Sequence, residues 1–498
     1  MTHPIDNLAA AAAAPGVERV DVEAVNKEAS RSLYKKRVPV HPKRVWGTFR
    51  KLKWVVMAVT LGIYYLVPWI RWDRGPSAPD QAVLIDFPGR RFYFFFIEIW
   101  PQEVYYLTGL LILAALGIFL AATLAGRVWC GYSCPQTVWT DLYVWVERLV
   151  EGDRSARMRL DKAPWSADKF IKRVVKHAIW LLIAVATGGA WVFYFADAPT
   201  LAGQLLTLDA PTTAYLWIAI FTTTTYVLGG HAREQVCIYM CPWPRIQAAL
   251  IDEDSLAVTY RTDRGEPRGA HKKGDPWEGR GHCIDCNQCV AACPMGIDIR
   301  DGLQLECIQC ALCIDACDTV MNRVDLPHGL IGYDTDNAMR QRATDETPRY
   351  RLVRPRTLVY AALIALVGCI MLYAFSTRAV LELGVQRDRN PMFTTLSDGS
   401  VRNGYTVKIL NMLREERTFV IALDGLENVD VKAVGIPTED AGSVTVHVDP
   451  DSVRAVRLFL TVPAAALSDA QAAIDFVVTD TESGTVARHD SFFVGPDQ

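Results

Sequence analysis

Five stretches of apolar residues are separated by polar and charged stretches along the chain. They cover residues 54–70, 104–125, 177–196, 213–229 and 357–375. None of them has a Lys, Arg, Asp or Glu in its middle, and each is about as long as an α-helix needs to be to cross a bilayer. The pattern therefore predicts five transmembrane α-helices.

A different pattern occupies residues 376–498, where apolar and polar residues alternate in short runs. Alternation of this kind is typical of half-buried strands. The turn signals Asn403-Gly404 and Asp449-Pro450 lie between runs, and short strands joined by turns predict an all-β sandwich. The segment has no Cys and no Trp, so we expect it to dock or assemble rather than to carry chemistry. The runs are residues 405–410, 418–423, 443–448, 456–462 and 473–478.

Basic residues orient the predicted helices. Residues 31–53 carry nine Lys or Arg and residues 126–176 carry ten, whereas residues 197–212 carry none. Because basic loops stay on the cytoplasmic side of a membrane, the regions 1–53, 126–176 and 230–356 are predicted to be cytoplasmic. The segment after the fifth helix is then periplasmic, and the predicted location is the bacterial inner membrane.

Composition agrees with a multi-domain membrane protein. The mean hydropathy is +0.12, 51% of the 498 residues are hydrophobic, and the net charge of −3 gives no indication of nucleic-acid binding. No signal peptide is recognisable at the start of the chain. The predicted order is a flexible basic lead (1–53), four helices (54–229), a cytoplasmic region (230–356), a fifth helix (357–375) and the β domain (376–498).

Eight of the thirteen cysteines lie in the cytoplasmic region, in two runs of Cys-x2-Cys-x2-Cys-x3-Cys. This is the ligand pattern of bacterial ferredoxins with two [4Fe-4S] clusters, in which the fourth Cys of each run binds the other cluster. We therefore expect a two-cluster ferredoxin-type domain at about residues 270–325. The expected ligands are Cys283, Cys286, Cys289 and Cys317 for one cluster, and Cys307, Cys310, Cys313 and Cys293 for the other.

Two other uses of these cysteines are weaker. A pair of zinc knuckles needs only two Cys-x2-Cys pairs per site, which leaves the third and fourth Cys of each run without a role. Disulfides are rare in the reducing cytoplasm, where the topology places these residues.

A second cysteine motif occurs twice, at the predicted cytoplasmic ends of the second and fourth helices. Cys130 and Cys134 precede Pro135, and Cys237 and Cys241 precede Pro242. In a helix, positions i and i+4 share one face, and the proline ends or kinks that helix. Four thiolates at matching depth would favour Cu(I) among biological metals, so these four cysteines are candidate catalytic and copper-binding residues.

The remaining candidates have simpler explanations. A lone Cys is often a small buried hydrophobe, and this is our interpretation of Cys369. His231, which follows two glycines, suits a helix cap or an interface better than a metal ligand. Met240 is typical of ordinary packing, although both residues lie near enough in sequence to serve as additional ligands.

The order of these features resembles the CcoG/FixG/RdxA family of cytochrome oxidase accessory proteins over nearly the whole chain after about residue 40. The features are the basic lead, the Trp-Cys-Gly-Tyr-Ser-Cys-Pro motif at 129–135, the second Cys-x3-Cys-Pro motif, the ferredoxin runs, the fifth helix and the β tail. One departure from generic ferredoxins is Asp318, where a proline commonly follows the fourth Cys.

The resemblance implies a membrane iron–sulfur protein that reduces Cu(II) to Cu(I) for the copper centre of a cbb-type cytochrome c oxidase, and so a cupric reductase. It also implies an immunoglobulin-like tail. Expected partners are membrane lipid, oxidase subunits or copper-delivery proteins, and a cytoplasmic electron donor. Two alternatives are a quinol dehydrogenase-type electron-transfer subunit, as in periplasmic nitrate reductase systems, and a scaffold for oxidase assembly without a redox role.

Overall fold

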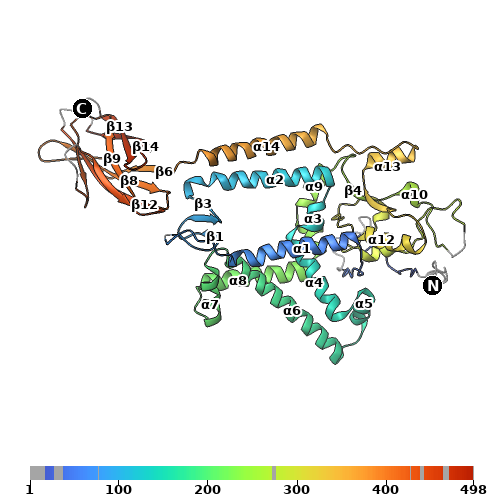
Figure 1. Cartoon of the computed structure of the whole chain (residues 1–498). Helices are drawn as coiled ribbons and strands as arrows, with labels where there is room; N and C mark the ends of the chain where they lie inside the picture. The colour runs from blue at the N-terminus through green and yellow to red at the C-terminus, as the bar shows by residue number, and fades with distance from the viewer. Residues whose placement is uncertain are drawn as a thin grey trace. The chain divides into compact units, whose positions relative to one another are not determined.

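The computed structural model describes residues 17–26, 38–76, 78–271, 276–426, 428–437, 442–463 and 470–496. The chain forms two compact units, one of residues 1–71 and 81–371, and one of residues 72–80 and 372–498. The first unit holds the long helices and all eight cysteines of the ferredoxin runs, and the second holds the β domain (Figure 1).

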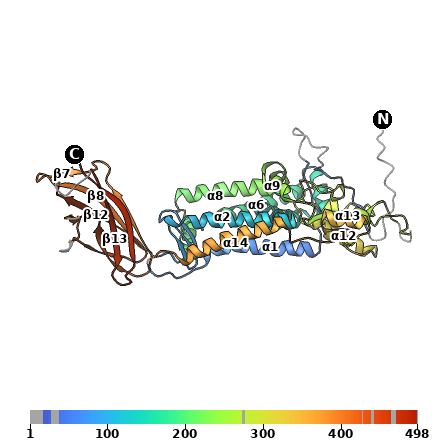
Figure 2. The same ribbon diagram turned by 90° about the horizontal axis from the view of Figure 1, so that it is seen from above.

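Long apolar helices run lengthwise beside one another in the first unit (Figure 2). Within the described residues, four are long and apolar enough to cross a membrane: α1 (Thr48–Leu66, continued to Trp69), α2 (Tyr105–Ala125, preceded by Pro101–Glu103), α6 (Ala167–Val192) and α14 (Pro355–Ser376). Most of their apolar side chains face outward, and none of the residues in the most apolar stretch of α14 is buried. Such an apolar surface suits lipid rather than water.

The predicted helix at residues 213–229 differs from the other four. Its α-helical part, α8 (Thr212–Thr225), continues as the π-helical segment η4 (Tyr226–Ala232). It passes as a span only together with α7 (Ala198–Thr207), to which it is bent by 92°. The structure therefore supports four spans, or five if this bent pair counts as one, and the number five stays a prediction.

Packing against aromatic rings accounts for the location of the π-helical segment. A methyl group on Gly229 would lie 2.8 Å from the ring of Tyr143, and one on Gly230 would lie 3.1 Å from the ring of Trp180. The two glycines thus let the backbone approach α4 (Pro135–Glu151) and α6 closely. π-Helical turns of this kind are found mostly at functional sites.

Short elements connect the long helices. A three-stranded antiparallel sheet that the sequence pattern did not predict lies between α1 and α2, and it consists of β1 (Val83–Asp86), β2 (Arg91–Phe94) and β3 (Ile97–Ile99). The helices α3 (Val128–Tyr132), α4, α5 (Arg154–Lys162) and α9 (Trp243–Leu250) lie near the cysteine motifs.

The ferredoxin runs lie in a compact α+β insert. Its sheet pairs β4 (Ala257–Tyr260) with β5 (Ile331–Asp334) in antiparallel fashion. The later part of each cysteine run is helical: α11 (Gln288–Ala292) contains Cys289 of the first run, and α12 (Leu312–Arg323) contains Cys313 and Cys317 of the second. The insert also contains α10 (Thr262–Gly265), and α13 (Asp336–Ala343) follows it.

Residues 17–26 of the basic lead contact the ferredoxin insert, while the flexibility expected for the lead as a whole stays a prediction. The backbone N–H of Val20 donates to the carbonyl of Cys286 at 3.1 Å, and that of Asn26 donates to the carbonyl of Gly296 at 3.1 Å. Val17 is buried in the same core as the ferredoxin cysteines. Residues 17–26 are therefore an extended strap along the first cysteine run. The alanine-rich stretch 9–14 lies outside the described residues.

The C-terminal unit is a sandwich of two antiparallel sheets, which confirms the all-β prediction. Rings of Tyr405 and Phe476 from opposite sheets meet at 5.1 Å between centroids in its core. One sheet has the order β10-β12-β8-β6 with β7 beside β8, and the other has the order β11-β9-β13-β14. The strands are β6 (Leu381–Arg387), β7 (Thr394–Thr395), β8 (Val401–Asn411), β9 (Arg417–Asp424), β10 (Asp430–Ala433), β11 (Val444–Val448), β12 (Ser452–Val462), β13 (Gln471–Asp480) and β14 (Val486–Val494).

One of the two predicted turns in this unit is wrong. Asn403-Gly404 lies inside β8, where the side-chain amide of Asn403 donates to the carbonyl of Val494 at 2.8 Å. An Asn-Gly pair favours a turn locally, but burial of this amide against β14 outweighs that preference. Asp449-Pro450 does lie at the connection between β11 and β12.

Candidate iron–sulfur centre

The two cysteine runs have the same backbone conformation. Asp285 and Asn287 have φ of 52° and 57° in the first run, and Gln309 and Ala311 have φ of 54° and 59° at the equivalent positions of the second. Left-handed residues other than glycine are uncommon and cluster at functional sites. Their repetition at four matching positions indicates that each loop is shaped to wrap around a bound group.

The cysteines surround two neighbouring cavities, each lined by members of both runs. One cavity is lined by Cys283, Cys286, Cys289 and Cys317. The other is lined by Cys293, Cys307, Cys310 and Cys313, with Cys289 between the two cavities. The fourth Cys of each run thus lies with the first three of the other run.

These residues fit a [4Fe-4S] cluster in each cavity. A cubane takes one thiolate on each of four irons, so its ligands surround a cavity instead of meeting at one ion. The described residues accordingly contain no group of three or more His, Cys, Asp or Glu side chains placed to hold a single ion. Burial raises the pKa of Cys307 to about 11 and that of Cys293 to about 12, so thiolates here need a bound cation.

Charged and polar groups border the first cavity. The Arg300 guanidinium donates to Asp298 at 2.7 Å, to Asp285 at 2.7 Å and to Asn287 at 2.9 Å. It thereby ties the left-handed loop of the first run to the segment that follows α11. Arg300 is also among the residues that line the cavity.

The two Cys-x3-Cys-Pro motifs have the same backbone conformation, in which only the first Cys of each is helical. Cys130 lies in α3, and Cys134 is extended, with ψ of 128°, before Pro135 begins α4. Cys237 lies in the π-helical segment η5 (Val236–Met240), and Cys241 is extended, with ψ of 124°, before Pro242. In both motifs the helix breaks at the second Cys.

The four thiols of these motifs lie within electrostatic reach of one another. Burial, followed by repulsion from Cys134, Cys130 and Cys241, raises the pKa of Cys237 to about 12. Burial likewise raises the pKa of Cys130 to about 11, opposed by the nearby Arg127. The structure thus brings the two motifs near one another, but no three of these four thiols are placed to hold a single ion, and copper binding by them stays a prediction.

Cys130 packs directly against the ferredoxin insert. It belongs to the same buried core as Cys283, Cys289 and Cys310, and Cys237 packs against that core. The adjacent Gly131 has no room for a side chain, because a methyl group there would lie 2.8 Å from the carbonyl oxygen of Ile308. No solvent layer separates this motif from the loop that carries Cys307 and Cys310.

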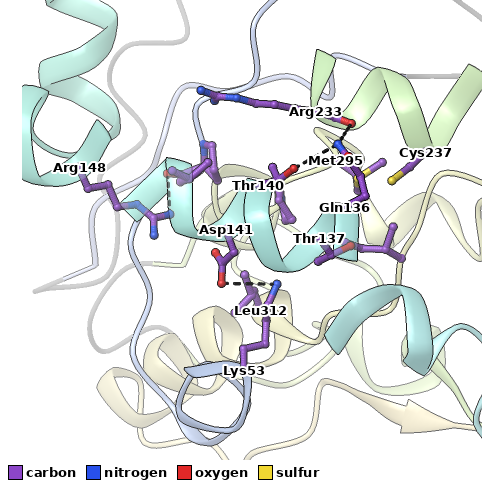
Figure 3. Close-up of a pocket in the computed structure, with 14 residues that line it drawn as sticks. Lys53, Gln136, Thr137, Thr140, Asp141, Arg148, Arg233, Cys237, Met295 and Leu312 are labelled. Carbon is purple, nitrogen blue, oxygen red and sulfur yellow. Dashed lines mark hydrogen bonds and ion pairs between the residues drawn. The ribbon is translucent and has the colours of Figure 1, made fainter. Parts of the chain in front are cut away.

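A small cavity of about 40 Å³ is lined by Cys237 and also by Lys53 of α1 and Asp141 of α4 (Figure 3). Met295 of the insert lines the same cavity. Farther along, the Nζ atom of Lys53 lies 3.8 Å from a carboxylate oxygen of Asp141. The cavity therefore joins a soft sulfur-bearing end to a charged end.

The remaining candidates from the sequence, Cys369, Met240 and His231, do not line this cavity. Cys369 is exposed on α14, which differs from the buried packing we expected. Met240 is 62% exposed. The His231 ring packs against Tyr226 at 5.1 Å and His177 at 5.7 Å between centroids, so it lies at a helix interface as predicted.

Sequence reasoning missed Arg127 and Gln247. The Cys130 thiol donates to the side-chain oxygen of Gln247 at 2.9 Å, and Gln247 and Arg127 are both buried. Their burial marks them, because Arg is almost never fully buried without a partner, and the sequence alone carried no signal for it.

Fold and site together define a membrane iron–sulfur redox protein. The 4Fe-4S dicluster domain family matches residues 232–336, and a 4Fe-4S binding domain family matches residues 107–151. The family of the Ig-like fold at the C-terminus of FixG matches residues 371–496.

The chain belongs to the FixG/RdxA family. It is 54% identical to the nitrogen fixation protein FixG of Rhizobium meliloti, over 94% of this chain and 95% of that protein. It is 52% identical to protein RdxA of Cereibacter sphaeroides, over 87% of this chain and 91% of that protein. A weaker similarity, 24% identity over 42% of this chain and 65% of the relative, links it to the ferredoxin-type protein NapH of Haemophilus influenzae.

Proposed function

We propose that this protein carries electrons through two [4Fe-4S] clusters to Cu(II) at the Cys-x3-Cys-Pro motifs, and so supplies Cu(I) for the copper centre of a cbb-type cytochrome c oxidase. The observation that carries the proposal is the packing of Gly131, beside Cys130, on the backbone of Ile308 and Gln309. Over such a short separation an electron needs no mobile carrier.

The chain's own residues have separable tasks in this function. The cysteines of the two runs would hold the clusters, which supply single electrons when bound. Cys130, Cys134, Cys237 and Cys241 would bind copper, the substrate, because soft thiolates favour Cu(I) over Cu(II). The electron that turns Cu(II) into Cu(I) comes ultimately from a soluble one-electron carrier of the cytoplasm, such as a reduced ferredoxin or flavoprotein.

The membrane topology of the proposal follows from the basic residues. The insert and the lead face the cytoplasm of the bacterial inner membrane, and the C-terminal β domain faces the periplasm. Both sets of cysteines then lie on the cytoplasmic side, so no electron has to cross the bilayer.

The test uses full-length protein purified without oxygen in detergent. Its clusters are reduced with dithionite, the excess is removed, Cu(II) is added, and Cu(I) is captured by a specific chelator while cluster absorbance is followed. We expect the Cys130→Ser/Cys134→Ser variant to lose at least tenfold in the rate of Cu(I) formation and to keep its iron. Cys369→Ser, which alters an exposed Cys of α14, is the matched control and should retain the wild-type rate.

A second candidate is transfer between the clusters and a quinone, the alternative that the resemblance to membrane subunits of periplasmic nitrate reductase systems raised. A quinone analogue replaces Cu(II) in the same assay. If the analogue reoxidises the clusters while Cu(II) leaves them reduced, the copper proposal is wrong and the quinone function replaces it. If neither acceptor reoxidises them, a scaffold role in oxidase assembly is favoured.

A further inference from the structure

Three buried side chains around Cys130 and Cys307 have hydrogen-bond donors without partners. They are Nε of Arg127, Nε2 of Gln247 and Nε2 of Gln309. The three side chains are 3%, 0% and 1% exposed, so bulk water does not reach them, although Arg127 and Gln309 also border a cavity beside Cys307. An unpaired buried donor is costly, and three around the same two cysteines indicate an acceptor that belongs there.

Two hydrogen bonds hold Arg127 against the second cysteine run. Its N–H donates to Oε1 of Gln309 at 2.8 Å, and its guanidinium donates to the carbonyl of Leu305. Gly126 makes this approach possible, because its φ is +57° and a methyl group there would lie 2.4 Å from Oε1 of Gln309. Leu305 and Gln309 flank Cys307 on either side.

Arg127 also faces the copper-binding motif. It lies three residues before Cys130, and its charge acts on both the Cys130 and the Cys307 sulfurs. Among the described residues no carboxylate pairs with Arg127. This is unusual for a buried guanidinium, which is normally paired.

Gln247 contacts the Cys130 sulfur as well, and we call Arg127, Gln247 and Gln309 together the Arg127 junction. Its oxygen accepts from the Cys130 thiol at 2.9 Å, and its nitrogen is the unpaired donor. A half-turn of the amide would present that nitrogen to the sulfur in its thiolate form, since the two ends of the amide have the same shape.

We propose that Arg127, with Gln247 and Gln309, is a positioning residue for negative sulfur, one that stabilises both the cluster held by Cys307 and the thiolate of Cys130. The inference rests on the proposed function, because it takes Cys130 as a redox site. Besides backbone carbonyls such as that of Leu305, which already accepts from Arg127, the sulfurs of Cys130 and Cys307 are the acceptors close to these three side chains. Positive charge and hydrogen bonds to such sulfurs raise a cluster's reduction potential.

Arg300 gives a matched comparison at the other cavity. It lines the cavity of Cys283, Cys286, Cys289 and Cys317, but Asp298 and Asp285 already pair with it. Arg300 thus lines its cavity and has carboxylate partners, whereas Arg127 has none among the described residues and reaches the second cavity through Gln309, which lines it.

The experiment is a redox titration of the full-length protein, followed by electron paramagnetic resonance, with iron content measured in parallel. Arg127→Gln should shift one of the two cluster potentials to a more negative value and leave iron content unchanged. Arg127→Lys, which keeps the charge, should restore most of that potential. Arg300→Gln should shift the other potential instead.

Two outcomes would overturn the proposal: no shift in Arg127→Gln, or a shift of the same potential in Arg127→Gln and Arg300→Gln. If Arg127→Gln loses iron, Gln309→Glu gives the answer, because it keeps the acceptor for the Arg127 N–H and replaces the unpaired donor with negative charge. It must then lower the same potential. Wild-type Cu(I) formation is measured separately, so failure of the copper function does not affect this result.

Discussion

A single glycine sets the distance between the two redox motifs. Gly131 faces the carbonyl oxygens of Ile308 and Gln309 and the Cα atom of Cys310, and a methyl group there would lie 2.8–3.0 Å from all three. These are backbone atoms of a cluster-binding loop, which cannot rotate aside as a flexible side chain could. Any larger residue must therefore push the loop away from α3.

We expect Gly131→Ala to destabilise the first unit by about 1–3 kcal/mol, the usual cost of overpacking a tight core. The displaced loop carries Cys307 and Cys310, so the variant should also lose cluster iron faster to a chelator. Iron release followed at 410 nm, together with thermal unfolding, measures both effects.

Gly117→Ala is the control for this change, because nothing lies within 4 Å of a methyl group at Gly117 in α2. It should leave iron release unchanged and stabilise the helix slightly. Equal iron release in the two variants would show that close packing at Gly131 does not hold the loop.

The grouping of the cysteines around two cavities was predictable at this scale, whereas the positions of Arg127 and Gln247 were not. Spacing alone groups the cysteines, because each short run must reach neighbouring corners of one cube. Arg127 acquires its role from Gly126 and from Gln309, which is 182 residues away in sequence. A pattern of neighbouring residues cannot predict a contact between residues so far apart in sequence.

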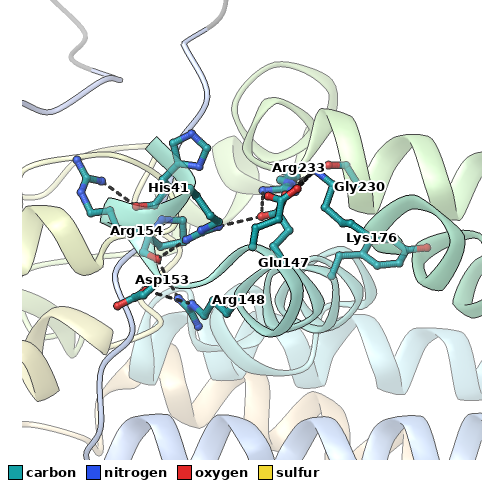
Figure 4. Close-up of polar contacts among 12 residues, drawn as sticks. His41, Glu147, Arg148, Asp153, Arg154, Lys176, Gly230 and Arg233 are labelled. Atoms are coloured by element: carbon teal, nitrogen blue, oxygen red, sulfur yellow. Dashed lines mark hydrogen bonds and ion pairs between the residues drawn. The ribbon is translucent and has the colours of Figure 1, made fainter. Parts of the chain in front are cut away.

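At the scale of elements, a buried ion cluster ties four helical segments together (Figure 4). Glu147 of α4 accepts from Arg157 of α5 at 2.9 Å and from Arg233, after η4, at 2.6 Å. Lys176 of α6 lies 3.8 Å from the same carboxylate and 3.0 Å from Glu151. The cluster holds η4, which leads into the Cys237 motif, against α4, which begins after the Cys134 motif.

Glu147→Gln should destabilise the first unit by roughly 3–5 kcal/mol at neutral pH, because it leaves buried cations without their counter-charge. Burial alone would raise the pKa of Glu147, but Arg233, Arg157 and Lys176 outweigh it and lower this pKa from 4.5 to about 2. The stabilisation is therefore complete above about pH 5 and is lost as the pH falls toward 2. Thermal unfolding followed by Trp fluorescence should show a flatter pH dependence between those values in the variant.

Asp168→Asn is the control for the ion cluster. Asp168 pairs with Lys172 at 2.7 Å on an exposed face, and exposed pairs contribute about 0–1 kcal/mol. A loss in Asp168→Asn as large as that in Glu147→Gln would contradict a special role for the buried cluster.

The sequence predicts the long helices better than it predicts the π-helical turn and the strap of residues 17–26. Apolar length alone predicts α2 and α14, because a bilayer requires it. The π-helical turn at η4 depends on the rings of Tyr143 and Trp180, and the strap of residues 17–26 depends on hydrogen bonds to the distant Cys286 loop. Both depend on contacts between distant parts of the chain, so a short stretch of sequence cannot predict them.

At the scale of the whole molecule, the two units have separate cores. The sandwich buries Tyr405, Phe419, Phe476 and Phe493 within its own sheets, and the ferredoxin cysteines belong to the core of the other unit. A domain of this size buries enough surface to fold alone without disulfides. We therefore expect residues 377–498 to fold as an isolated domain with a single cooperative unfolding transition.

The complementary truncation tests what the sandwich contributes to redox chemistry. A chain that ends at Ser376 keeps every cysteine and all the residues of the Arg127 junction, so it should retain its iron, both cluster potentials and the wild-type rate of Cu(I) formation. Any loss should appear only in cells, as reduced oxidase assembly, because the sandwich would then be the docking part. If purified truncated protein forms Cu(I) at less than a tenth of the wild-type rate with full iron content, the sandwich takes part in the reaction itself, and the division of tasks between the two units is wrong.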